Sequence, residues 1–81
     1  MKVEILGTGC KRCDQLYENA KAASAALNPR AAIEVVKVGD IAYFSQKGVF
    51  MTPGLLIDGQ VVSVGKVLTV EEIRSKLEEK L

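Results

Sequence analysis

Apolar and polar positions divide the first part of the chain into a short β-rich run and a helix-period segment. Lys2 to Leu6 is a β-rich run that predicts a buried strand, and the Gly7-Thr8-Gly9 loop ends it. From Lys11 to Leu27 apolar residues recur at three- and four-residue intervals, which predicts a helix. Its periodic positions are Cys13, Leu16, Tyr17, Ala20, Ala23 and Leu27. Asn28-Pro29 should end this helix, because proline disfavours the α conformation in the residue before it.

A second strand and a short helix follow. Ala32 to Val38 predicts the second strand, and a helical connection of this length makes the first two strands parallel. Asp40 has a side chain suited to capping a short helix that runs through Lys47. Gly48 then serves as the C-terminal stop of that helix.

The last third of the chain predicts a hairpin and a final helix. Asp58-Gly59 lies between the β-rich runs Leu55–Ile57 and Val61–Val64, a strong signal for two antiparallel strands. Thr69-Val70-Glu71-Glu72 has capping-box spacing and should start a helix. The apolar face of that helix consists of Ile73, Leu77 and Leu81. The order is β-α-β-α-β-β-α, and with no repeat or linker to divide it we expect a single domain over residues 1–81.

Composition indicates one small globular domain, with 81 residues and 48% hydrophobic content. A domain of this size buries roughly 60–65% of its unfolded surface, which is enough to fold without disulfide support. Eleven basic and ten acidic residues, with no basic stripe, give no electrostatic reason to expect nucleic acid or membrane binding. There is no long apolar run, and the first strand follows Met1 too closely for a signal peptide. We therefore expect a cytoplasmic protein, a monomer with protein partners.

Candidate chemistry is concentrated in Cys10 and Cys13, the only two cysteines of the chain. Two intervening residues let both sulfurs share one helical turn, where a disulfide can form and break. As a structural staple such a bridge would be poor, because the loop it closes is short. A tetrahedral zinc site needs four protein ligands, and the chain has two thiols and no histidine. The spacing therefore favours a redox-active dithiol that needs no other cofactor.

The two cysteines are predicted to have unequal roles. Cys10 should lie at a helix N-terminus, where free N–H groups and the helix dipole favour a thiolate, so it should attack a partner's disulfide. Lys11 and Arg12 should strengthen that field and lower the pKa of the thiol. Cys13 lies one turn further along, on the apolar face of the helix, where it should stay protonated and shielded. Its task would be to resolve the mixed disulfide.

The element order and several motifs resemble the thioredoxin fold. The motifs are Gly7-Thr8-Gly9-Cys10 with Cys13, then Thr52-Pro53-Gly54 before a strand, the Asp58-Gly59 hairpin, and Val64-Gly65 before the last helix. The whole chain looks like the small, glutaredoxin-sized redox-active disulfide proteins of archaea and bacteria. This resemblance implies an α/β fold in which three helices flank a four-stranded mixed sheet.

The resemblance also implies an activity and further site residues. In that family a cis-proline loop faces the disulfide and offers backbone groups to an extended substrate, which here corresponds to a cis Thr52-Pro53 bond. Thr8, Gly9 and Gly65 complete the implied substrate-binding set. The implied function is thiol–disulfide exchange with disulfide-bearing protein substrates, with an upstream reductase returning the dithiol. Lys11-Arg12 stands where typical thioredoxins have Gly-Pro, and Thr8 stands where glutaredoxins have a lysine, which argues against glutathione specificity.

Glu4 has two interpretations. Thioredoxins carry a buried acid six residues before the first cysteine, and Glu4 has that spacing, which makes it a candidate for tuning the thiol pKa. The other interpretation, which we slightly favour, leaves Glu4 solvated on a sheet face that the short second helix does not cover.

A second pair of interpretations concerns the apolar stretch before the Thr52-Pro53 loop, which contains Phe44, Val49, Phe50 and Met51. We expect these side chains to belong to the core. The alternative is an apolar docking surface beside the disulfide.

Small copper-binding domains offer a competing hypothesis for the whole chain. They also place a Cys-x-x-Cys between the first strand and helix, and two soft thiolates are suited to Cu(I) without histidine. Those domains resemble β-α-β-β-α-β and end in a strand, whereas this chain is predicted to end in a helix. A soft-metal carrier is therefore the alternative, and the dithiol oxidoreductase is the main hypothesis.

Overall fold

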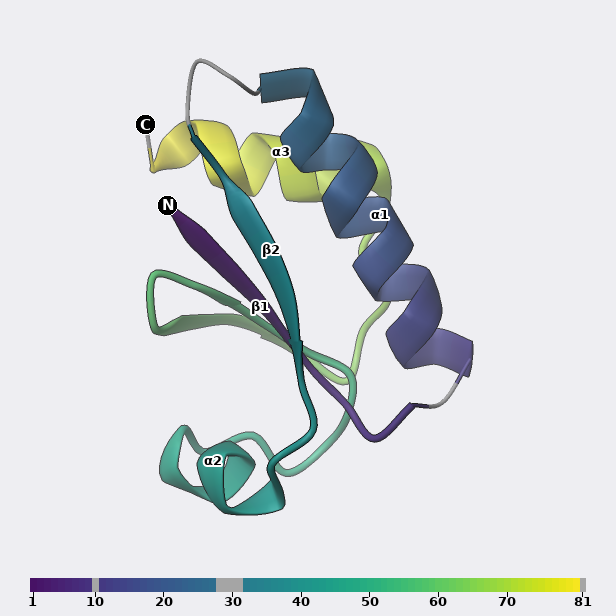
Figure 1. The fold of residues 1–81 in the computed structure, drawn as a ribbon, viewed down its shortest axis with the longest axis vertical. Helices are drawn as coiled ribbons and strands as arrows, with labels where there is room; N and C mark the ends of the chain where they lie inside the picture. The colour runs from purple at the N-terminus through teal and green to yellow at the C-terminus, as the bar shows by residue number, and fades with distance from the viewer. Residues whose placement is uncertain (10, 28–31, 81) are drawn as a thin grey trace.

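The computed structural model describes residues 1–9, 11–27 and 32–80. Its elements follow the predicted order (Figure 1). They are β1 (Lys2–Leu6), α1 (Lys11–Leu27), β2 (Glu34–Val38), α2 (Ile41–Gln46), β3 (Gly54–Ile57), β4 (Gln60–Val64) and α3 (Val70–Glu79). The fold is thus the α/β arrangement that the resemblance implied, a four-stranded mixed sheet with three helices.

The four strands are ordered β2-β1-β3-β4 in the sheet. β1 and β2 run parallel, as the helical crossover between them predicts. β3 is antiparallel both to β1 and to β4. β1 therefore occupies a central position, and its C-terminal end carries the chain into the cysteine motif.

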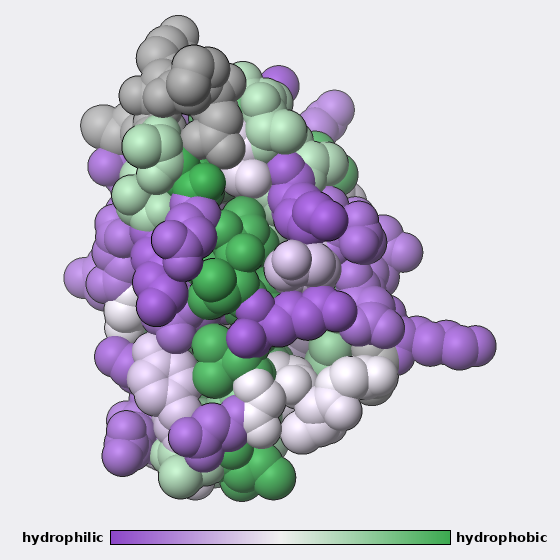
Figure 2. Space-filling view, viewed as in Figure 1, coloured by the Kyte–Doolittle hydropathy of each residue, from purple (hydrophilic) through white to green (hydrophobic). Residues whose placement is uncertain are grey.

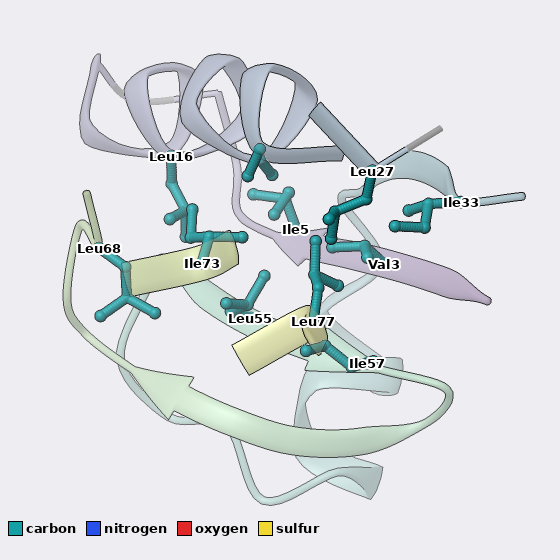
Figure 3. Packing of buried hydrophobic residues seen from close by; sticks show 12 residues of the cluster. Val3, Ile5, Leu16, Leu27, Ile33, Leu55, Ile57, Leu68, Ile73 and Leu77 are labelled. Carbon is teal, nitrogen blue, oxygen red and sulfur yellow. The ribbon is translucent and has the colours of Figure 1, made fainter. Parts of the chain in front are cut away.

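Strand alternation sorts the core into two clusters. Val3 and Ile5 of β1 face α1 and α3, where they pack with Leu16, Leu55 and other apolar residues (Figure 3). Leu6, the residue after Ile5, packs instead with residues on the α2 side of the sheet. That second cluster consists of Leu6, Phe44, Val49 and Leu56. The long helices thus cover one face, and the short α2 with its flanking loop covers the end of the other.

The strand boundaries differ from the prediction at β2, which begins at Glu34 rather than Ala32. Ala32 has φ +48°, in the left-handed region, and so cannot continue an extended ladder. The hairpin was predicted correctly. Asp58 and Gly59 form its two-residue turn with φ of +50° and +84°, the double positive φ of a type I′ turn.

Both predicted helix caps are present. The Asp40 carboxylate accepts a hydrogen bond from the Ala42 N–H at 3.0 Å. Thr69 and Glu72 form a reciprocal capping box at the start of α3. α1 extends to Leu27 as expected, whereas the Asn28-Pro29 stop and Leu81 lie outside the described residues.

The apolar stretch that precedes the Thr52–Pro53 loop is only partly core. Phe44 and Val49 are buried, as expected, but Phe50 is 81% exposed and Met51 is 66% exposed. The core interpretation is therefore wrong for these last two residues, because they lie in the loop that connects α2 to β3. Ile41, the first residue of α2, is also exposed, and the space-filling view shows apolar surface at the end of the molecule where α2 lies (Figure 2). Within the described ranges, no helix has the length and apolar character needed to cross a membrane.

Candidate functional site

The sheet topology brings the ends of all four strands together at one edge. Leu6, the last residue of β1, pairs with Val38 at the end of β2 and with Gly54 at the start of β3. Gly54 in turn pairs with Val64 at the end of β4. The loop after β1, the loop before β3 and the loop after β4 therefore meet at this edge, although they are far apart in sequence. They contain most of the predicted site residues.

Cys13 lies in the first turn of α1 and is buried, with 4% of its surface exposed. Its side chain packs directly against the backbone of Gly7, so that a Cβ on Gly7 would come within 2.7 Å of Cys13 Cβ and even nearer to its sulfur. The Gly7 N–H donates to the carbonyl of Val38 at 3.0 Å, which fixes this glycine at the end of β1. The close approach of helix and strand at this point therefore requires glycine.

The predicted attacking residue, Cys10, lies outside the described residues. Of the loop before it, Thr8 and Gly9 are exposed, and Gly9 has φ +91°, which favours glycine. These two predicted substrate-binding residues therefore lie on the surface immediately before Cys10 in the chain.

The loop before β3 contains the predicted cis-proline, and the Thr52–Pro53 bond is cis in the structure. Pro53 is fully buried, whereas Thr52 is half-buried. The Pro53 carbonyl accepts a hydrogen bond from the Gly65 N–H at 2.8 Å, which joins the loop before β3 to the loop after β4. Two predicted substrate-binding segments are thus held against each other.

Arg12 connects this pair of loops to α1. Its Nη2 donates to the Gly65 carbonyl at 2.7 Å, so Gly65 is linked to Arg12 through its carbonyl and to Pro53 through its N–H. The sequence indicated Arg12 and Lys11 only as positive charges near the thiols, and both are exposed. The contact between Arg12 and Gly65 spans 53 residues and had no signal in the sequence.

Glu4 is buried, with 7% exposure, so the interpretation that left it solvated is wrong. Alternation along β1 turns Glu4 toward the face of Leu6 and Leu56, which α2 covers. A hydrogen-bonding interaction between the Tyr43 phenol and Glu4, together with burial and the negative charge of Glu4, raises the pKa of Tyr43 of α2. Tyr43 was missed by the sequence analysis, because the pattern did not show that α2 would reach the middle of β1.

An ion pair neutralises the acid nearest the cysteine motif. Asp14 lies in the first turn of α1, and its Oδ1 is 3.1 Å from Lys37 Nζ of β2. Lys37 also lies over the ring of Tyr17, 4.6 Å from its centroid. Among the described residues, which do not include Cys10, no group of three or more potential metal-ligating side chains is present.

Comparison with known proteins gives consistent results. A family model described as "Thioredoxin domain" matches residues 1–78. A protein of Methanocaldococcus jannaschii named thioredoxin is 44% identical over 75 residues, covering 93% of this chain and 84% of that protein. A thioredoxin of Methanothermobacter thermautotrophicus is 38% identical over 77 residues, covering 95% of this chain and 97% of that protein.

Proposed function

Since the chain belongs to the thioredoxin family, with its thiol–disulfide oxidoreductase activity, we propose that it exchanges electrons with protein disulfides through Cys10 and Cys13. The observation that carries the proposal is the position of Cys13. This thiol is buried against Gly7, at the sheet edge where the Thr52–Pro53 turn and Gly65 also lie. Such a site gives one cysteine a shielded position beside a surface loop.

The proposed reaction transfers two electrons and two protons. The Cys10 thiolate attacks one sulfur of the partner's disulfide and forms a mixed disulfide, and the other partner sulfur leaves as a thiolate that takes up a proton. The Cys13 thiol then loses its proton and attacks Cys10, which closes the Cys10–Cys13 disulfide and releases the second partner thiol. The partner disulfide is reduced to two thiols, and the dithiol of this protein is oxidised.

In this proposal, other predicted site residues bind the partner or favour the Cys10 thiolate. Thr8, Gly9, Thr52, Pro53 and Gly65 bind the partner segment. Lys11 and Arg12 favour the thiolate through their charge. We place the reaction in the cytoplasm, where an upstream reductase can return the disulfide to the dithiol.

Trapping experiments test the proposal and the assignment of roles. Reduced wild-type protein should reduce the disulfides of a test protein, measured by the release of thiols. Cys13→Ser should accumulate a mixed disulfide with the test protein, visible as a covalent adduct without reductant, because nothing resolves it. Cys10→Ser should trap almost nothing and lose activity. Equal trapping by both variants, or faster alkylation of Cys13 than of Cys10, would overturn the assignment, and no thiol release by the wild type would overturn the function.

A further inference from the structure

The surface around Gly65 combines positive charge with exposed apolar side chains. We define the Gly65 rim as Lys11, Arg12, Met51, Gly65 and Lys66. Lys11, Arg12, Met51 and Lys66 are exposed. Met51 lies against Gly65, so that a Cβ there would be 3.4 Å from Met51 Cβ. Phe50, beside Met51 in the chain, is 81% exposed.

The charge of Arg12 is held in place on this rim. The guanidinium donates one hydrogen bond to the Gly65 carbonyl, at 2.7 Å from Nη2. A guanidinium has five N–H donors in a planar fork, so most of its donors stay available on an exposed side chain. Because the N–H of the same glycine donates a hydrogen bond to the Pro53 carbonyl, the cation has a defined position beside the cis-proline turn.

The nearest acid in the sequence does not offset this charge. Asp14 is paired with Lys37 at 3.1 Å, so its negative charge is balanced by a lysine outside the rim. The rim itself contributes three cations, from Lys11, Arg12 and Lys66, of which Lys66 also interacts electrostatically with Glu72 of α3. A segment that lies along it would gain by placing carboxylates there.

We propose that the Gly65 rim selects disulfides whose cysteine is flanked by acidic side chains, with Arg12 as the specificity-determining residue. The inference rests on the proposed function, since it names the substrate class of the same site. An acidic side chain next to the substrate cysteine accepts a hydrogen bond from the free donors of Arg12. Lys11 and Lys66 add attraction that is not directional.

Three matched peptide disulfides test the inference. Each is the disulfide-linked dimer of one short peptide, with Glu, Gln or Lys on both sides of its cysteine. Reduced protein in excess reduces each disulfide in a single turnover, and each rate is divided by the rate with dithiothreitol to remove differences in intrinsic reactivity. We expect the wild type to prefer the Glu peptide over the Gln peptide by about threefold at low salt, with the Lys peptide slowest. High salt should reduce this preference.

Two variants distinguish the effect of Arg12, whose position is fixed by Gly65, from the effect of a nearby positive charge. Arg12→Gln should bring the Glu-to-Gln ratio close to one, whereas Lys11→Gln, which removes an adjacent charge without the Gly65 contact, should keep most of it. A changed redox potential alters the rates for all three peptides together and cancels in the ratio. Equal normalised rates for the three peptides, or a ratio unchanged by Arg12→Gln, would overturn the inference alone. If the wild type reduced none of the three peptide disulfides, this result would contradict the proposed function itself.

Discussion

Gly7 and Cys13 are in direct contact, with no room for a side chain on the glycine. A Cβ at Gly7 would be 2.7 Å from Cys13 Cβ, a distance that real side chains do not tolerate. The glycine is fixed to β2 by its hydrogen bond to Val38, and Cys13 is fixed in the first turn of α1. The position of the buried cysteine relative to the sheet therefore depends on this glycine.

Substitution of Gly7 by alanine should destabilise the protein, because α1 or the end of β1 would have to shift. We expect a loss of about 1–3 kcal/mol in the free energy of unfolding, the usual range for overpacking. Gly39→Ala is the matched control, since a Cβ at Gly39 meets only the Gly7 carbonyl oxygen at 3.6 Å, an ordinary contact. Urea unfolding of both reduced variants measures the difference. Equal stabilities would contradict the proposed role of Gly7.

The charges of Lys11 and Arg12 should affect the redox equilibrium of the dithiol. Both side chains are expected to favour the thiolate, which stabilises the reduced form relative to the disulfide. Replacement of both by glutamine should make the couple more reducing, by on the order of 10–30 mV. Equilibration with a glutathione redox buffer measures the potential. Lys11→Gln alone separates the effect of charge from the loss of the Arg12–Gly65 bond, and an unchanged or higher potential in the double variant would refute the prediction.

The sequence predicted the fold well because its signals are local. Helix periodicity after Lys11, the Asp58-Gly59 turn and the Thr69–Glu72 capping box each depend on neighbouring residues, and all three are present. The pairing of β1 with β2 followed from the crossover, and the pairing of β3 with β4 followed from the hairpin. What was missed depends on contacts between distant segments.

Two site features illustrate that limit. The Arg12–Gly65 bond joins the start of α1 to the loop after β4, 53 residues apart in the chain, so no sequence window contains it. Glu4 was expected to be solvated because α2 is short, yet Tyr43 reaches across to it. For Phe50 and Met51, hydrophobicity alone could not distinguish the core from an exposed loop before a buried proline.

The contact between Glu4 and Tyr43 gives a prediction in alkaline solution. The hydrogen bond to Glu4 raises the pKa of Tyr43 above its ordinary value, because ionisation would break it and place two negative charges together. Glu4→Gln should lower the pKa of Tyr43 toward about 10. Ultraviolet absorbance of tyrosinate reports the titration, and a Tyr17→Phe background leaves Tyr43 as the single tyrosine of the chain.

The interaction between Glu4 and Tyr43 should also make the free energy of unfolding depend on pH in alkaline solution. A group whose pKa is raised on folding contributes stability below its unfolded pKa, and that contribution is lost as pH rises through the folded pKa. The contribution of Tyr43 should therefore be complete at neutral pH and disappear above about pH 10. Circular dichroism over the same range checks that the protein is still folded where the phenol titrates. A pKa of Tyr43 that Glu4→Gln leaves unchanged would contradict the assigned hydrogen bond.

The capping box of α3 gives the corresponding prediction in acid. The Thr69 backbone N–H donates to Glu72 Oε1 at 3.0 Å, and this bond is the main cause that lowers the pKa of Glu72, with the Thr69 side chain acting in the same direction. A carboxyl whose pKa is lowered on folding stabilises the protein when the pH is above its unfolded pKa of about 4.3. This stabilisation is lost as the pH falls through the folded pKa. Glu72→Gln should therefore be less stable than the wild type at neutral pH, and the difference should shrink in acid.

Urea unfolding measures this difference in stability at neutral pH and at about pH 3, a pH that is well below the unfolded pKa of Glu72. Glu71→Gln removes a charge from the same helical turn without touching the box, so its effect should be smaller. A difference between Glu72→Gln and the wild type that stays constant with pH would mean that the carboxylate charge does not contribute through this bond.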